Sequence, residues 1–148
     1  MTGRNHRRIR LHGTVAVQLP PSEAIELFTP SGERRWARGW NPTFPVPTAD
    51  ETEPGIVFET REHGPLTWVV IGRGSGDSIK YAVVAPGLRA GTIEVACADD
   101  GNGSTVATVT YDMTALTEDG DLWLAEFAAE YDAYLDHWYH AITTAIRA

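Results

Sequence analysis

Hydrophobic side chains recur every three or four residues over the last thirty positions of the chain, residues 119–148. This spacing matches one face of a helix with 3.6 residues per turn, and no proline interrupts it. Thr117 is a suitable N-cap, and the acidic residues after it complement the helix dipole. A helix with such a stripe needs a large apolar partner, which the rest of the chain must supply. The apolar positions are Leu124, Phe127, Ala128, Tyr131, Leu135, Trp138, Ile142, Ala145 and Ile146.

The second regular pattern is an alternation of hydrophobic and polar residues, which predicts strands with one buried face. Residues 8–18 alternate in this way, with Leu11, Val15 and Val17 on the hydrophobic face. Five further strands are predicted at residues 56–62, 66–73, 78–85, 90–98 and 105–114. The segments between these five are short and rich in Gly, Pro, Asp and Asn, which indicates tight turns in an antiparallel meander.

Two short helices are predicted between the first and second strands, at residues 22–28 and 33–40. In the second of them, Trp36 and Trp40 are four residues apart and share a face. Residues 41–54 contain four prolines, so this segment is predicted to be a loop, anchored by Phe44 and Val46. A seventh strand near residues 44–46 is an alternative that the sequence leaves open.

The order of elements predicts an α+β domain in which the long helix covers one face of the sheet. The two short helices would cross an end of the sheet and close the space between the sheet and the long helix. That space is either a filled core or a ligand cavity.

Several short motifs carry a family resemblance. Residues 28–36 read Phe-Thr-Pro-Ser-Gly-Glu-Arg-Arg-Trp, and Gly-Trp-Asn-Pro follows at residues 39–42. On these motifs the chain resembles the START/Bet v 1-like superfamily, also called SRPBCC, and specifically its small bacterial polyketide cyclase/dehydratase-like members. The resemblance extends over residues 12–146. Further matching positions are Tyr81, residues 91–92, Thr105, Tyr111, residues 114–116 and Trp138.

The resemblance implies a helix-grip fold, in which a curved antiparallel sheet of six to seven strands wraps around the long C-terminal helix. It implies that residues 1–148 are a single START/Bet v 1-like domain, with residues 1–7 as a basic N-terminal arm. Members of the superfamily bind lipids, sterols, polyketides or other apolar ligands in the enclosed cavity, and some are enzymes. They share no catalytic motif, so the fold implies no particular reaction here.

Charge and cysteine content exclude several classes of protein. The net charge is −8, and the basic residues Arg4, Arg7, Arg8 and Arg10 lie in a first stretch of ten residues without an acid. The rest of the chain is more acidic still, which argues against a nucleic-acid surface on the domain. Cys97 is the only cysteine, so no intramolecular disulfide can form. No secretory leader and no membrane-spanning run is recognised, and a cytoplasmic protein is expected.

Few polar motifs predict chemistry. The glycine-rich residues 72–76 are interpreted as a hairpin turn rather than a phosphate loop, because no helix follows them. His137 and His140 are interpreted as solvated helix surface rather than metal ligands. Cys97 is predicted to be a buried structural cysteine. The sequence therefore predicts no metal, no cofactor and no identifiable catalytic residue.

The aromatic residues are the strongest candidates for a binding site, because they would either fill the core or line a cavity with tyrosine hydroxyls as polar groups. Glu33, Arg34 and Arg35, next to Trp36, would either guard the entrance or solvate a short helix, and the second interpretation is favoured. The cavity candidates are Trp36, Trp40, Trp68, Tyr81, Tyr111, Phe127, Tyr131 and Trp138.

Three functions remain open at this level. The first is a module that binds a hydrophobic or aromatic small molecule without covalent chemistry. The second is a cyclase/dehydratase-type enzyme, in which Tyr81, Tyr111 or an inward arginine polarises a carbonyl or moves a proton. The third is an interaction protein whose groove accepts an apolar segment of a partner. The sequence does not decide whether the protein is an enzyme or whether it forms a homodimer.

Overall fold

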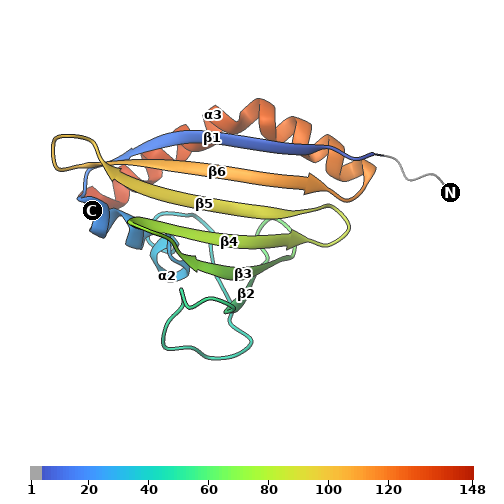
Figure 1. Ribbon diagram of the computed structural model, residues 1–148, viewed down its shortest axis with the longest axis horizontal. Helices are drawn as coiled ribbons and strands as arrows, with labels where there is room; N and C mark the ends of the chain where they lie inside the picture. Colours follow the sequence, from blue (N-terminus) through green and yellow to red (C-terminus); the bar gives the residue numbers. More distant parts are fainter. Residues whose placement is uncertain (1–4) are drawn as a thin grey trace.

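The computed structural model describes residues 5–148, which form one six-stranded antiparallel sheet and a long C-terminal helix (Figure 1). The strands pair in the order β1-β6-β5-β4-β3-β2, so the first strand pairs with the last. The short helical segments lead from β1 at one edge to β2 at the other. The elements are β1 (Arg8–Val17), α1 (Pro21–Ala24), the 3₁₀ helix η1 (Ile25–Phe28), α2 (Pro30–Glu33), β2 (Val57–Thr60), β3 (Leu66–Arg73), β4 (Asp77–Ala85), β5 (Arg89–Asp99), β6 (Thr105–Ala115) and α3 (Glu118–Arg147).

The long helix α3 packs on the inner face of the sheet, against β1 and β6. Thr117 caps it as predicted, because its hydroxyl accepts a hydrogen bond from the Gly120 N–H at 3.1 Å. The helix lies very close to β1 at Gly13, where a Cβ atom would stand only 2.6 Å from Cδ1 of Leu135. The predicted helix-grip architecture is confirmed, with its six strands and its single long helix.

The second short helix lies earlier in the chain than predicted. The helical turn is α2, and residues 34–40 form turns instead of the expected helix over residues 33–40. Thr29 accepts a hydrogen bond from the Gly32 N–H at 3.0 Å, and Pro30 takes the first helical position, where its missing N–H costs nothing. The four-residue spacing of Trp36 and Trp40 is therefore not a helical repeat.

Residues 41–54 form a loop, as predicted, but only one of its two expected anchors is buried. Phe44 packs against Phe58 with ring centroids 5.5 Å apart, whereas Val46 is 72 % exposed. In place of a seventh strand, the described residues contain an isolated bridge between Thr43 and Glu59. A single bridge does not extend the sheet, because the prolines around it cannot donate ladder hydrogen bonds.

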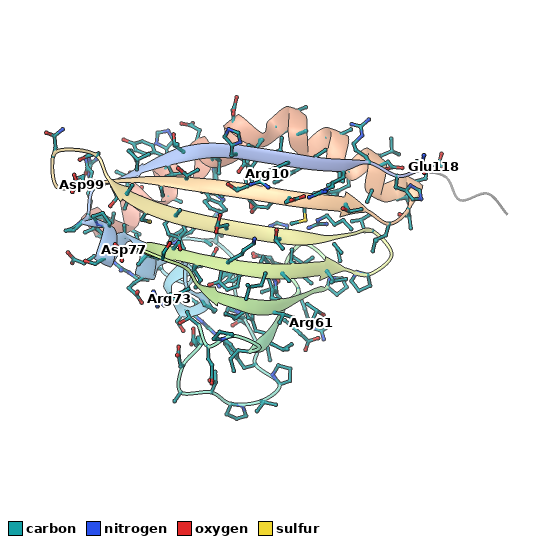
Figure 2. The ribbon with its side chains drawn as sticks, in the orientation of Figure 1. Arg10, Arg61, Arg73, Asp77, Asp99 and Glu118 are labelled. Carbon is teal, nitrogen blue, oxygen red and sulfur yellow. The ribbon has the colours of Figure 1, made fainter. Side chains whose placement is uncertain are left out.

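The outer face of the sheet is largely covered by polar and charged side chains such as Arg10 (Figure 2). On this face Arg8 binds Asp112 on the neighbouring strand at 2.8 Å. The predicted basic arm, residues 1–7, lies partly outside the described residues. Its last two residues bind the start of α3, because His6 Nδ1 and the Arg7 N–H both contact the Asp121 carboxylate. Within residues 5–148, no helix has both the length and the apolar character needed to cross a membrane.

Candidate functional site

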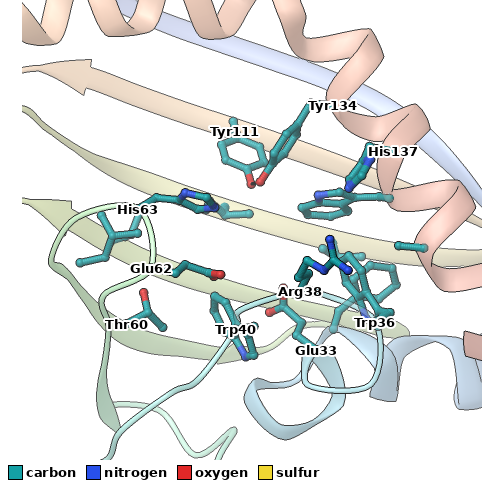
Figure 3. Close-up of a pocket in the computed structure, with 18 of the residues that line it drawn as sticks. Glu33, Trp36, Arg38, Trp40, Thr60, Glu62, His63, Tyr111, Tyr134 and His137 are labelled. Atoms are coloured by element: carbon teal, nitrogen blue, oxygen red, sulfur yellow. Dashed lines mark hydrogen bonds between the residues drawn. The ribbon is translucent and has the colours of Figure 1, made fainter.

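A cavity of about 1000 Å³ lies between the inner face of the sheet, α3 and the segment that follows η1 (Figure 3). Seven of the eight aromatic residues predicted as cavity candidates line it: Trp36, Trp40, Trp68, Tyr81, Tyr111, Phe127 and Trp138. Trp123 also lines it, so all five tryptophans of the sequence face this one space. The aromatic residues therefore enclose open space as well as packing against one another.

Tyr131 is the predicted candidate that is not part of the cavity wall. It is buried between α3 and the sheet, and its hydroxyl donates a hydrogen bond to the Val109 carbonyl at 2.7 Å. The helical stripe brings Tyr134 to the cavity instead, one turn further along the same helix. The sequence signal for Tyr134 was present, since it stands three residues after Tyr131 and four before Trp138.

The N–H groups of three of the five tryptophans are satisfied by protein oxygens. Trp36 Nε1 donates to the Leu27 carbonyl at 2.8 Å, and Trp40 Nε1 donates to the Pro30 carbonyl at 2.8 Å. Trp68 Nε1 donates to the Thr60 hydroxyl at 3.0 Å. Ring packing fixes these side chains further, for example in the stacked pair of Phe58 and Trp68 with centroids 5.5 Å apart. The indoles therefore present hydrocarbon surface to the cavity in fixed orientations.

Three tyrosines in the cavity lining, Tyr81, Tyr111 and Tyr134, contribute neutral hydroxyl groups. The Tyr81 hydroxyl donates to the Phe28 carbonyl at 2.8 Å, which ties β4 to η1. The hydroxyls of Tyr111 and Tyr134 lie 3.2 Å apart and meet at the cavity (Figure 3). Burial, followed by the neighbouring Tyr134, raises the pKa of Tyr111 well above its ordinary value. All three hydroxyls are therefore protonated donors at neutral pH.

Glu33 contributes a carboxyl group to the cavity, contrary to the expectation that it solvates a short helix. Within residues 5–148, neither a hydrogen-bond donor nor a cation pairs with this carboxyl. Burial raises the pKa of Glu33 well above its ordinary value, and the nearby Glu62 raises it further. The carboxyl contacts the cavity space but is closely surrounded by protein, so its charged form is poorly hydrated. Its neighbour Arg34 does lie at the surface, where it donates to the Pro42 carbonyl at 3.0 Å.

Glu62 lies close enough to Glu33 to affect its pKa, and Gly39 packs tightly against the Glu62 carboxylate. This glycine has a φ of 78°, and a Cβ atom there would collide with the Glu62 carboxylate. Glu33 lies at the cavity next to Trp36, in line with the less favoured interpretation of residues 33–35. Glu62 shows no sequence signal for the cavity, because its approach to Glu33 depends on how α2 and the segment between β2 and β3 meet.

Arg89 enters the cavity from the first position of β5. Its guanidinium carbon lies 3.6 Å from the centroid of the Trp123 ring, which is a cation–π contact. Its Nε atom is buried and has no hydrogen-bond partner within residues 5–148. Burial lowers the pKa of Arg89, which remains a cation at neutral pH. The inward direction of Arg89 can be read from the sequence, because alternate residues of a strand face the same side and Arg89 is four positions before the inward Ile93.

The remaining polar candidates do not form a reactive site. His137 and His140 lie at the exposed edge of the cavity, and His140 contacts Asp136 at 3.5 Å. In residues 5–148, no three metal-ligating side chains converge. Cys97 is buried outside the cavity, and burial raises the pKa of its thiol to about 12. Residues 74–76 form the turn between β3 and β4, in agreement with the predicted hairpin.

No family model matches the sequence, and no curated protein matches it either. Solved structures do match it over nearly the whole chain. An uncharacterized protein from Rhizobium leguminosarum has a TM-score of 0.70 at 14% identity, covering 99% of this chain and 100% of its own. CalU16 from Micromonospora echinospora has a TM-score of 0.62 at 15% identity, covering 96% and 80% of the two chains.

Norcoclaurine synthase from Thalictrum flavum, solved in complex with dopamine and hydroxybenzaldehyde, has a TM-score of 0.69 at 11% identity. The match covers 99% of this chain and 94% of the synthase. Identities this low establish the fold alone, and the protein therefore has the helix-grip fold of the Bet v 1-like proteins.

Proposed function

We propose that the protein binds a hydrophobic or aromatic small molecule, of lipid, sterol or polyketide type, in the cavity between the sheet and α3. The observation that carries this proposal is an open space of about 1000 Å³ lined by all five tryptophans. Binding pockets for small molecules are mostly apolar, with a few polar groups that fix orientation, and they measure roughly 300–1,000 Å³. The dopamine and hydroxybenzaldehyde in norcoclaurine synthase support aromatic ligands as one class to test.

The test is a fluorescence titration with the uncharged probe N-phenyl-1-naphthylamine. Wild-type protein should bind it, and Ala141→Trp should weaken binding by at least about tenfold, because the added indole occupies part of the cavity. The matched control is Ala133→Trp, which adds the same side chain to an exposed position of α3 away from the cavity. Absence of probe binding to the wild type, or equal binding by both variants, would contradict the proposal.

A second function has one specific observation in its favour. Glu33 is a poorly hydrated carboxyl without a protein partner inside a ligand-sized cavity, which is the setting of a general acid. It supports an enzyme of cyclase/dehydratase type acting on a ligand in the same cavity. The check is an NMR titration of the Glu33 side-chain carboxyl. Titration at the value of an ordinary solvated glutamate would remove the observation on which this candidate depends.

A further inference from the structure

We propose that the ligand of this cavity carries an anionic oxygen group, such as a carboxylate, and that Arg89 binds this group beside the Tyr111 and Tyr134 hydroxyls. This inference rests on the proposed binding function and adds the chemical class of the ligand. The molecule would be a hydrophobic acid, with its apolar body among the tryptophans and its charged end at the β5 and α3 side of the cavity.

Arg89 lacks a carboxylate partner within residues 5–148, whereas two other arginines pair with a carboxylate on another element. Arg8 forms a bidentate pair with Asp112, and Arg73 forms one with Glu26. Both of those pairs are at the surface. In Arg89 the Nε atom is buried and has no hydrogen-bond partner in residues 5–148. A buried donor without a partner is unfavourable, and a ligand anion would supply the missing acceptor.

The surroundings of Arg89 keep its N–H groups free for a ligand. Its guanidinium carbon lies 3.6 Å from the centroid of the Trp123 ring, and Trp123 stacks on Phe127 with centroids 4.9 Å apart. A cation–π contact holds the guanidinium through its charge, so the N–H donors that bind a carboxylate are not taken up by it. The ring contact therefore positions Arg89 without using its hydrogen-bonding capacity.

The hydroxyl pair of Tyr111 and Tyr134 faces the same cavity as Arg89. Burial lowers the pKa of Arg89, and Tyr111 and Tyr134 both act to raise it. The three groups come from adjacent strands β5 and β6 and from the facing part of α3. Two protonated hydroxyls next to a guanidinium provide neutral and charged donors for one anionic oxygen group.

Glu33 also lines the cavity, and it contributes to the raised pKa values of Tyr81, Tyr111 and Tyr134 after burial. An anionic ligand group near those hydroxyls would further disfavour ionisation of Glu33. The ligand that fits this arrangement has one acidic group at Arg89 and no second negative charge near Glu33.

The experiment compares two probes that share one ring system. 8-Anilino-1-naphthalenesulfonate carries a sulfonate, and N-phenyl-1-naphthylamine does not. Arg89→Met should raise the Kd of the sulfonate probe by about tenfold or more, the effect expected for losing a charge-assisted hydrogen bond, and change the Kd of the uncharged probe less than about twofold. Displacement of the uncharged probe by laurate but not by 1-dodecanol would extend the result to carboxylates.

Two further variants distinguish loss of the anionic subsite from general effects of substitution on probe binding. Arg61→Met removes an exposed arginine outside the cavity and should leave both Kd values unchanged. Tyr134→Phe is the second test, because it removes a hydroxyl without removing the ring, and it should weaken only the sulfonate probe. The anionic subsite would be overturned if Arg89→Met changed the Kd values of both probes equally. It would also be overturned if neither Arg89→Met nor Tyr134→Phe changed the Kd of the sulfonate probe. Failure of wild-type protein to bind either probe would instead overturn the binding function.

Discussion

Replacing Glu33 with glutamine should change how the stability of the protein depends on pH. Burial raises the pKa of Glu33 above its unfolded value, so between the two values the folded state holds one proton more than the unfolded state. Stability contributed by the neutral carboxyl is therefore fully present below the unfolded pKa near 4.5 and is lost as pH rises toward the folded pKa. Glutamine is neutral at every pH, so the Glu33→Gln variant does not lose this stability as the pH rises.

The size of the pH effect on stability follows from the one proton by which the folded and unfolded states differ. One proton of difference gives a slope of at most about 1.4 kcal/mol per pH unit in the free energy of unfolding. The Glu33→Gln variant should thus gain stability relative to wild type at up to this rate, starting near pH 4.5 and ending at the folded pKa of Glu33. Above that pH the difference should stay constant.

The assay is urea denaturation followed by far-ultraviolet circular dichroism, at half-unit steps from pH 4.5 to 8. Glu130→Gln is the matched control, because Glu130 is exposed on α3 outside the cavity, and its curve should parallel that of the wild type. Parallel curves for wild type and Glu33→Gln would refute the reasoning, because they would mean that the carboxyl is as well hydrated as a surface glutamate.

Three further predictions concern capping, core hydrogen bonding and thiol reactivity. Thr117→Ala should lower the free energy of unfolding by about 1 kcal/mol in urea denaturation, because the Gly120 N–H loses its capping acceptor. An unchanged denaturation midpoint would show that Thr117 does not stabilise α3 as its N-cap. Tyr131→Phe should cost about 1 kcal/mol through the lost bond to Val109 and leave affinity for N-phenyl-1-naphthylamine unchanged, whereas weaker probe binding would assign Tyr131 to the cavity after all. Cys97 should react with a thiol reagent at pH 8 far more slowly in the native protein than in urea, because burial raises its pKa to about 12; equal rates would show that the thiol is accessible.

The strands and the long helix were predictable because their signals are local. Alternation along residues 8–17 and the three-to-four spacing along α3 depend only on which face of an element is buried. The helical turn near Trp36 lies earlier in the chain than the tryptophan spacing predicts, and the reason is also local. Pro30 at the first helical position and Thr29 as its cap set the start of α2, and these two signals outweigh the four-residue spacing of Trp36 and Trp40.

The polar part of the candidate site was only partly predictable. Arg89 follows the inward parity of β5, so its direction could be read from the strand pattern. The burial of Glu33 could not, because a single turn of helix has no periodicity to read and tertiary folding brings Glu62 and the cavity-lining tyrosines near this carboxyl. Residues whose environment comes from three separate elements leave no pattern along the chain.

The placement of all five tryptophans around one cavity gives the protein a built-in optical reporter. Most proteins have tryptophans scattered through the core and surface, so a change at one site is diluted by emission from the others. Here every indole borders the same space, and their N–H groups are tied to protein oxygens in at least three cases. Any molecule that enters should therefore alter the whole intrinsic emission at once, so unlabelled compound collections can be screened directly on the native chain.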